Sequence, residues 1–396
     1  MEPLYINAYT AVTALGAGRG PTRDALIAMR SGLTPADFDA GPAQGYIGRV
    51  AGLESVRLPA TLDEYDCRNN RLAWLGLHAD GFMATVDAAV DRHGRDRVGV
   101  VMGTSTSGIL TTEQGYKERD PVTGALPPSV RLGTTHNFGS IAEFVRVATR
   151  VHGPALAIST ACSSSAKAFA AAARWLAVGL VDAVVVGGVD SHCGTTLHGF
   201  GALQLVSNER CRPFDAHRDG ISLGEGAGFT LVEREPNDNP RRLVLLGYGE
   251  SSDAHHMSAP HPGGLGAELA MRGAMSMAGL DAARIDYVNA HGTATRNNDS
   301  VESAAVARLL GPTIPITSVK GFFGHTLGAA GAIGAVVSLL SIEFGFIPGT
   351  VNTTDIDPEC GNAVQCTSVT REVRHVLVNA FGFGGSNASL AFGAAH

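Results

Sequence analysis

Cys162 lies between a short apolar run and an alanine-rich stretch, in Pro154-Ala-Leu-Ala-Ile-Ser-Thr-Ala-Cys162-Ser-Ser-Ser-Ala. This pattern predicts a buried strand that turns into a helix ending near Gly179. Unsatisfied backbone N–H groups and the positive dipole end at the start of a helix favour the thiolate, the form of cysteine that attacks carbonyl carbons. Cys162 is therefore a candidate nucleophile. The alternative is a small buried thiol, with the serines acting only as helix caps.

Two histidines also follow apolar runs that are typical of buried strands. His291 follows the run 285–290, and His325 lies five residues after Lys320, which follows the run 314–319. Open α/β sheets place their sites at the carboxyl ends of such strands. A helix beginning beside His325 would disfavour the imidazolium, and the neutral ring could then donate a hydrogen bond to a developing oxyanion. Considered alone, a histidine in such a position is more often structural than catalytic.

Lys320 and Glu302 are charged residues in the same part of the sequence. Lys320 can be a half-buried cation at a strand end. Asp299-Ser-Val-Glu302 is typical of a helix N-cap with its reciprocal partner. Glu302 can cap that helix and still balance the charge of Lys320.

A glycine-rich segment interrupts an apolar strand pattern near the C-terminus, in Leu377-Val-Asn-Ala-Phe381-Gly-Phe383-Gly-Gly-Ser-Asn387. A turn of this composition lets backbone N–H groups approach a ligand closely, as an oxyanion hole requires. A plain hairpin would use the glycines in the same way. The residues alone leave both interpretations open.

Short Val- and Ile-rich runs recur along the chain, and we interpret them as strands buried on both faces. They are 97–102, 155–158, 182–186, 285–290, 314–319 and 373–380. Alanine-rich stretches with helical spacing lie between them, notably 166–178 and 329–343. The alternation predicts an α/β fold with mostly parallel sheets and helical crossovers.

Two other segments indicate how the chain is divided. The proline- and asparagine-containing segment 233–242 is typical of a surface connection. We therefore predict two halves, 1–240 with the cysteine and 241–396 with the two histidines. The segment 115–129, rich in charge, glycine and proline, predicts an excursion from the sheet that could serve a dimer or substrate surface.

The composition limits the classes of function. The chain has 396 residues, 44% of them hydrophobic, and a formal charge of −7 without a basic stripe, so nucleic acid is not expected as a partner. A local basic patch could still bind an acidic carrier protein. No signal peptide or apolar run long enough for a membrane span is visible, which predicts a cytoplasmic protein.

The other cysteines and a histidine cluster do not indicate further chemistry. Six cysteines are too few for a disulfide scaffold, and we interpret the five besides Cys162 as core or surface thiols. No metal site is predicted, because the spacing of His255, His256 and His261 matches neither a helix face nor a strand face.

Taken together, these residues resemble a known family, the thiolase-fold β-ketoacyl synthases that extend fatty acids and polyketides. The resemblance rests on six ordered motifs that span most of the chain. They are Thr-Ala-Cys162-Ser-Ser-Ser, Arg212-Pro-Phe-Asp-Ala-His-Arg-Asp219-Gly-Ile-Ser-Leu-Gly-Glu225-Gly-Ala-Gly, Asp253-Ala-His-His-Met-Ser-Ala-Pro260, His291-Gly-Thr-Ala-Thr295, Lys320 with His325, and Gly382-Phe-Gly-Gly-Ser-Asn387. The resemblance implies a five-layered αβαβα fold of two similar halves, and a homodimer that pairs through central sheets.

The resemblance implies roles for the residues that match. Cys162 would accept the acyl chain from carrier-bound phosphopantetheine, and the backbone N–H groups of Cys162 and Phe383 would hold the thioester oxygen. His291 and His325 would promote decarboxylation of a malonyl thioester and stabilise the enolate. Lys320 and Glu302 would organise the charges around them.

It also implies where the substrates bind. Thr293 and Thr295 would hydrogen-bond the pantetheine arm, and Phe383 would act as a gate that moves with the loop 253–260. The motifs around this gate add four substrate-binding residues, Asp253, Ser258, Phe381 and Gly384.

Some positions depart from the common pattern of the family. The stretch after Thr295 reads Arg-Asn-Asn-Asp where many relatives have proline and glycine. Thr106 places a hydroxyl where fatty-acid enzymes often have an apolar residue of the acyl pocket. With Cys67-Arg-Asn-Asn-Arg-Leu-Ala and the serine run after Cys162, the chain resembles ketosynthases of bacterial aryl-polyene pigment clusters.

The activity implied is decarboxylative condensation of a cysteine-bound acyl group with malonyl-acyl carrier protein, without a metal or organic cofactor. The main alternative is a chain-length-setting or noncatalytic partner subunit of a ketosynthase heterodimer, although such subunits usually lack the active cysteine. A degradative thiolase would have a second cysteine near the C-terminal glycine turn. A nicotinamide-dependent oxidoreductase is disfavoured, because no strand is followed by a GxGxxG turn.

Overall fold

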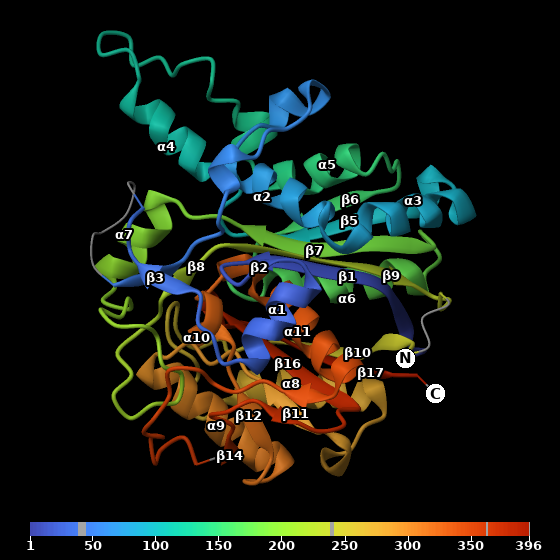
Figure 1. The fold of residues 1–396 in the computed structure, drawn as a ribbon, viewed down its shortest axis with the longest axis vertical. Coiled ribbons are helices and arrows are strands. Elements are labelled where there is room, and N and C mark those ends of the chain that lie inside the picture. Colours follow the sequence, from blue (N-terminus) through green and yellow to red (C-terminus); the bar gives the residue numbers. More distant parts are fainter. Residues whose placement is uncertain (39–44, 238–240, 362, 396) are drawn as a thin grey trace.

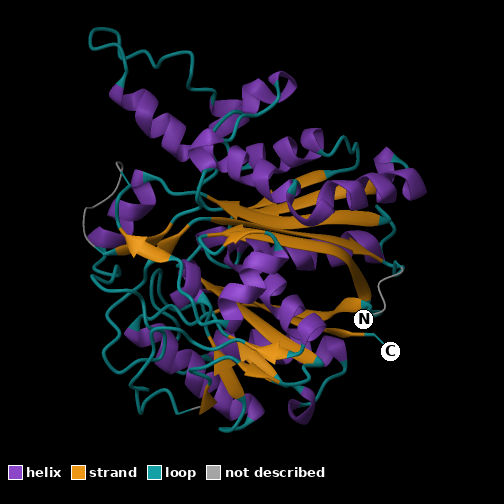
Figure 2. Cartoon of the chain, viewed as in Figure 1, coloured by secondary structure: helices purple, strands orange, loops and turns teal. Residues whose placement is uncertain are grey.

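The computed structural model describes residues 1–38, 45–237, 241–361 and 363–395. Figure 2 shows its layers from top to bottom: outer helices, a sheet, a central helical layer, a second sheet and further outer helices. This is the five-layered αβαβα arrangement, so the predicted thiolase-like α/β fold is confirmed.

Five strands of the N-terminal half follow one another along the sheet, besides the short strand β2 (Gly16–Ala17). Their spatial order is β1 (Leu4–Thr13), β9 (Gly226–Glu233), β7 (Ala183–Asp190), β5 (Val98–Gly103) and β6 (Ala155–Ile158). β7, β5 and β6 pair in parallel, whereas β9 runs antiparallel to both β7 and β1. The valine-rich strands β5 and β7 are buried along their whole length, as their continuous apolar sequences predict.

The C-terminal half repeats this plan. Its strands follow the order β14 (Ala363–Val364), β12 (Pro315–Thr317), β11 (Tyr287–Asn289), β16 (His375–Gly382), β17 (Ser386–Ala394) and β10 (Leu243–Ser252). β12, β11 and β16 pair in parallel, and β17 runs antiparallel to both β16 and β10. The two halves join where Leu4 and Tyr5 of β1 pair with Leu245 and Val244 of β10.

Two helices form the central layer between the sheets. α6 (Ser164–Ala177) and α11 (Ala330–Phe344) contact each other and strands of both halves. Their first turns lie so close that a side chain at Gly331 would meet the backbone nitrogen of Ala166 at 2.5 Å. The apolar stretch Leu327–Phe344 is long enough to cross a membrane, but 83% of it is buried inside the protein, so it is a core helix.

Further helices cover the outer faces of the sheets. On the N-terminal half these are α2 (Arg68–Leu77), α3 (Phe82–His93) and α5 (Gly139–Ala148), and on the C-terminal half α8 (Leu265–Ala278) and α9 (Arg296–Leu310). The remaining helices are α1 (Arg19–Ile27), α4 (Ile109–Lys117), α7 (Gly194–Ala202) and α10 (Lys320–Phe323). The short strands are β2 (Gly16–Ala17), β3 (Leu33–Pro35), β4 (Tyr46–Gly48), β8 (Leu223–Gly224), β13 (Phe346–Ile347) and β15 (Val369–Thr370).

Strand β6 differs from its prediction. The run 155–158 does form a strand, but this strand is the last of its sheet and is not buried on both faces. Leu156 is 38% exposed. The apolar sequence of β6 is therefore that of an edge strand, whose outer backbone groups have no partner strand in the described chain.

Two predictions concern segments outside the sheets. The predicted excursion 115–129 begins in the last turn of α4 and protrudes at the upper left of Figure 1, with most of its residues exposed. The predicted boundary after residue 240 falls at 238–240, which lie outside the described residues.

Close packing between β5 and the first turn of α6 generates a stability prediction. A methyl group at Gly103 would meet the backbone nitrogen of Ser165 at 2.3 Å, so Gly103→Ala must displace the turn that carries Cys162. We expect a loss of about 1 to 3 kcal/mol in the free energy of unfolding, measured by urea denaturation. Gly20→Ala is the control, because nothing lies within 4 Å of its added methyl group. Equal unfolding midpoints for the two variants would contradict this packing.

Candidate active site

Cys162 lies on a tight turn that two of the three following serines help to fix. Ala161 has a φ of +54°, a left-handed conformation that L-residues rarely adopt and that is found at functional sites. The Ser163 hydroxyl donates to the Thr160 carbonyl at 2.8 Å, and the Ser164 hydroxyl donates to the Ala161 carbonyl at 2.5 Å. These two serines therefore stabilise the turn that presents the sulfur, and the N-cap residue Ser163 makes no side-chain capping hydrogen bond to α6.

His325 contacts the sulfur directly. Its Nε2 lies 3.0 Å from Cys162 Sγ, and its Nδ1 accepts a hydrogen bond of 3.2 Å from the Leu327 backbone N–H. Because Nδ1 acts as an acceptor, a neutral ring carries its proton on Nε2 and directs it at the sulfur. The backbone N–H of His325 donates to the Ser222 carbonyl at 2.7 Å, so a segment of the N-terminal half holds this residue.

His291 completes the group from the neighbouring strand. Its ring centroid lies 5.3 Å from that of His325, with the ring planes at 81°. Its backbone carbonyl accepts a hydrogen bond from the buried ammonium of Lys320. Within the described residues its Nδ1 is buried without a hydrogen-bond partner, which leaves a polar atom for a substrate to satisfy.

Burial favours the neutral form of both imidazoles, which the sequence analysis expected for His325. The pKa of each ring lies well below its usual 6.5, mainly because burial penalises the cation and then because Lys320 is close. The Leu327 N–H, which lies just before α11, donates to Nδ1 of His325 and therefore needs that nitrogen unprotonated. Neutral N–H donors are what a developing enolate oxygen requires.

The predicted stabilisation of the Cys162 thiolate by backbone N–H groups is outweighed by burial. Burial raises the pKa of this thiol to about 11, although Lys320 and the backbone N–H groups of Phe383 and Cys162 itself favour the thiolate. These two N–H groups lie beside the sulfur, and their role as an oxyanion hole stays a prediction. The hairpin interpretation is confirmed, because β16 and β17 pair across the glycine turn.

Glu302 has a different structural role from the one predicted. It lies in the interior of α9, whose N-cap is Thr295, so the capping interpretation of residues 299–302 is wrong. Its two carboxylate oxygens accept the backbone N–H groups of His291 and Gly292, each at 2.8 Å. Asn379 donates a third hydrogen bond of 3.0 Å. Glu302 therefore fixes the backbone that carries His291, and its charge also raises the pKa of Lys320 against the effect of burial.

The predicted pantetheine-binding threonines share a fixed loop. The Thr293 and Thr295 hydroxyls lie 2.8 Å apart, and Ala294 between them has a φ of +64°. The buried carboxylate of Asp299 accepts the backbone N–H groups of Thr293 at 2.9 Å and Ala294 at 3.1 Å. Asp299 thus stabilises the strained residue, a role the sequence analysis did not assign.

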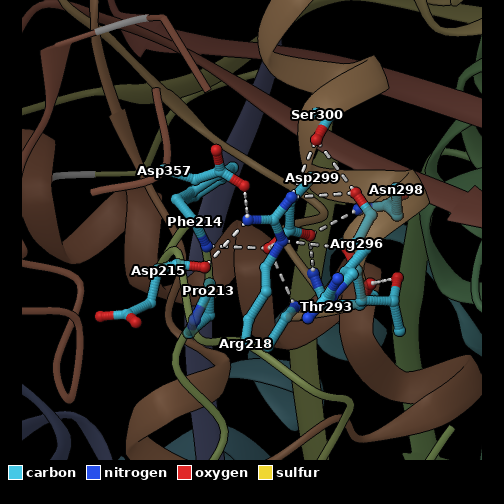
Figure 3. Close-up of polar contacts among 12 residues, drawn as sticks. Pro213, Phe214, Asp215, Arg218, Thr293, Arg296, Asn298, Asp299, Ser300 and Asp357 are labelled. Carbon is cyan, nitrogen blue, oxygen red and sulfur yellow. Dashed lines mark hydrogen bonds and ion pairs between the residues drawn. The ribbon is translucent and has the colours of Figure 1, made fainter. Parts of the chain in front are cut away.

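A buried arginine ties this loop to the other half of the chain (Figure 3). Arg218 is 1% exposed. Its Nε lies 3.8 Å from Asp299 Oδ2, and its Nη1 lies 2.5 Å from Asp357 Oδ2. It also donates to the Arg296 carbonyl at 3.0 Å and to the Ser300 hydroxyl at 2.8 Å. A buried guanidinium with this many partners is fully satisfied, so it fixes the position of the threonine loop.

The two predicted gate segments are hydrogen-bonded to each other. The Asp253 N–H donates to the Gly385 carbonyl at 2.9 Å, and the Gly384 N–H donates to the Met257 carbonyl at 2.7 Å. Phe383, 37% exposed, lies on this turn beside the ring of Phe200 from α7, with centroids 5.8 Å apart. The sequence analysis did not identify Phe200, because nothing in its local sequence connects it with the glycine turn.

One cavity of about 380 Å³ joins these groups. The predicted residues that line it are Cys162, His291, His325, Glu302, Phe383, Thr293, Thr295, Asp253, Ser258, Phe381 and Gly384. Lys320 is buried but does not line the cavity. Thr106 is also outside the lining, because its hydroxyl and its N–H both donate to the buried carboxylate of Asp190.

Fold and site together define a thiolase-fold condensing enzyme with a Cys-His-His site. Models of the N-terminal and C-terminal domains of beta-ketoacyl synthases match residues 60–237 and 243–354. The 3-oxoacyl-[acyl-carrier-protein] synthase 2 of Vibrio cholerae is 33% identical and covers 93% of this chain and 93% of its own length. The chain belongs to the β-ketoacyl synthase family, whose members condense an enzyme-bound acyl group with malonyl-acyl carrier protein.

Solved structures agree with this assignment. A chain of the complex between a ketosynthase and its chain length factor from Xenorhabdus doucetiae is 34% identical, with a TM-score of 0.90 over 100% of this chain and 98% of that one. A chain of the ishigamide ketosynthase/chain length factor is 28% identical, with a TM-score of 0.88 over 100% of both chains.

The raised thiol pKa predicts the pH dependence of Cys162 reactivity. Because only the thiolate is alkylated, labelling by iodoacetamide should still be rising at about pH 9 and level off near the thiol pKa of about 11. Intact mass at a fixed time across pH measures this, and Cys162→Ala corrects for the other five cysteines. A plateau by about pH 8 would mean that Lys320 and the two N–H groups outweigh burial.

Proposed function

We propose that this chain loads an acyl group onto Cys162 and extends it with a malonyl thioester, using His291 and His325 as neutral hydrogen-bond donors. The observation that carries the proposal is the contact of 3.0 Å between His325 Nε2 and Cys162 Sγ, beside a second neutral imidazole in the same cavity. No part of this chemistry requires a metal or organic cofactor. The buried ammonium of Lys320 also disfavours a metal cation between the three side chains.

Acyl transfer comes first. The Cys162 sulfur attacks the thioester carbonyl, and the backbone N–H groups of Cys162 and Phe383 hold the oxyanion that develops. The bond between the acyl carbon and the pantetheine sulfur then breaks. The proton of the Cys162 thiol passes to the departing pantetheine sulfur, so charge is balanced.

Condensation follows in the same cavity. Loss of CO₂ from the malonyl thioester leaves an enolate, whose oxygen accepts hydrogen bonds from His291 and His325. The enolate carbon attacks the acyl-cysteine carbonyl, a carbon–carbon bond forms, and the carbon–sulfur bond to Cys162 breaks. Cys162 leaves as a thiolate and regains one proton from solvent, while the β-ketoacyl group stays on the carrier.

The substrate class and the partners are finer proposals. We propose an acyl carrier protein as the donor of both thioesters, and an unsaturated, aryl-polyene-type chain as the acyl group, on the strength of the sequence resemblance. We also propose a cytoplasmic protein that pairs through β6 with a second copy of itself. The similar ketosynthases solved with a chain length factor make a heterodimer the second candidate. In either assembly this chain is the catalytic member, because it has all three site residues.

Substitutions in the site separate its two half-reactions. Cys162→Ala should take up no acyl mass from acyl-carrier thioesters, because it has no sulfur to load. His325→Ala should retain measurable loading but lose malonyl decarboxylation by about a hundredfold, because it removes one oxyanion donor. His217→Ala, at an exposed histidine, is the control and should match the native protein. Full decarboxylation by His325→Ala, or an adduct on Cys162→Ala, would contradict the assigned roles.

Pairing through β6 is tested separately by mass in solution. Leu156→Arg places a charge on the outer edge of β6, where Leu156 is 38% exposed, and should convert a dimer into a monomer in sedimentation analysis. Val178→Arg, at an apolar side chain 77% exposed outside β6, should stay dimeric. A native chain that sediments as a monomer would contradict pairing with its own copy.

A further inference from the structure

Helix α7 is held in place by a residue far away in the sequence. It spans only nine residues, Gly194–Ala202, and three of them are glycines, which weaken a helix more than any other residue except proline. The side chain of Cys193, its N-cap residue, makes no capping hydrogen bond. The sequence of α7 therefore does not fix this helix by itself.

Glu113 of α4 provides the missing cap. One carboxylate oxygen accepts the Gly194 N–H at 2.8 Å, and the other accepts the Thr195 N–H at 2.6 Å and the Thr195 hydroxyl at 2.5 Å. A carboxylate at this point satisfies two of the free N–H groups of the helix and also interacts favourably with its positive dipole end. Figure 1 shows α4 above α7, at the base of the protruding segment.

Helix α7 in turn contributes one residue, Phe200, to the lining of the active-site cavity. Leu197 is 3% exposed and packs in a cluster with Leu327, whose N–H binds His325. Near the other end, Phe200 lines the cavity with its ring 5.8 Å from that of Phe383. The ring that backs the proposed gate is therefore positioned by α7, and α7 is positioned by Glu113.

We propose that Glu113 is a positioning residue for acyl-chain selection: by capping α7 it holds Phe200 against Phe383 and keeps the acyl side of the cavity narrow. This inference rests on the proposed function, because it concerns which acyl groups reach Cys162. Without the carboxylate, α7 shifts or frays at its N-terminus and Phe200 no longer restrains Phe383. Long chains then gain access relative to short ones.

The experiment compares Glu113→Ala, Glu113→Gln and the control Gln114→Ala, whose side chain is exposed on the same helix. Loading of Cys162 from acetyl-, octanoyl- and dodecanoyl-carrier thioesters is followed by intact mass. The ratio of dodecanoyl to acetyl loading rates should rise about tenfold in Glu113→Ala, the scale of discrimination that pocket contacts provide. Glu113→Gln should be intermediate, because its amide offers one acceptor oxygen instead of two.

Two further readouts distinguish this role from general damage. Hydrogen exchange of the amides in 194–202 should accelerate about tenfold in Glu113→Ala and stay unchanged in Gln114→Ala. Malonyl decarboxylation should stay within about twofold of native, because Glu113 does not contact either catalytic histidine.

The outcomes are separable. If hydrogen exchange in α7 accelerates in Glu113→Ala but the ratio of dodecanoyl to acetyl loading does not change, Glu113 is merely structural and the proposal is overturned. Unchanged hydrogen exchange in α7 of Glu113→Ala also overturns it. Loss of decarboxylation together with loading also overturns it, because the damage would then extend over the whole site. A native protein that loads no acyl group overturns the proposed function itself, whereas native loading with an unaltered profile in Glu113→Ala overturns only the role of Glu113.

Discussion

Burial of the ionisable groups around Cys162 determines the chemistry of this site. His291, His325 and Lys320 are each less than a tenth exposed, and burial is the largest cause of the lowered pKa of all three. The same burial raises the pKa of the thiol. The resting site therefore contains neutral donors aimed at a neutral sulfur, and their hydrogen bonds strengthen only when negative charge develops. A site of this kind favours the transition state over the ground state.

Such burial is tolerated only where the backbone around it is satisfied. Glu302 accepts the N–H groups of His291 and Gly292, and Asp299 accepts those of Thr293 and Ala294. Two carboxylates from one helix thus bind four consecutive N–H groups of the loop that carries the catalytic imidazole. The two carboxylates that make this loop rigid also satisfy its backbone N–H groups, so the loop can be buried away from water. Burial and preorganisation therefore have the same cause.

Much of the fold could be predicted from local sequence, since buried parallel strands such as β5 and β7 have continuous apolar sequences. Strands β1, β9, β10 and β17 were not predicted. Three of them contain glycines, and their pairing partners lie far away in the chain, so their local pattern is weak. For the site, residue types after strand ends identified Cys162 and both histidines, which the structure brings together around one cavity. The pKa of the thiol, the position of Thr106 and the role of Glu302 could not be predicted, because each depends on burial or on hydrogen bonds to distant backbone. Asp299 and Phe200 were missed for the same reason.

The repeated strand order of the two halves gives the site a symmetry that the sequence conceals. β6 corresponds to β12 and α6 to α11, so the sulfur and the imidazole that contacts it both lie between a parallel strand of their half and its central helix. In the proposed chemistry one half provides the attacking sulfur and the other the hydrogen-bond donor, at matching positions of the two halves. Neither half contains the complete site by itself. Any change in the packing of α6 against α11 alters the distance between the Cys162 sulfur and the His325 ring. Selection on this chemistry must therefore act on the two halves together.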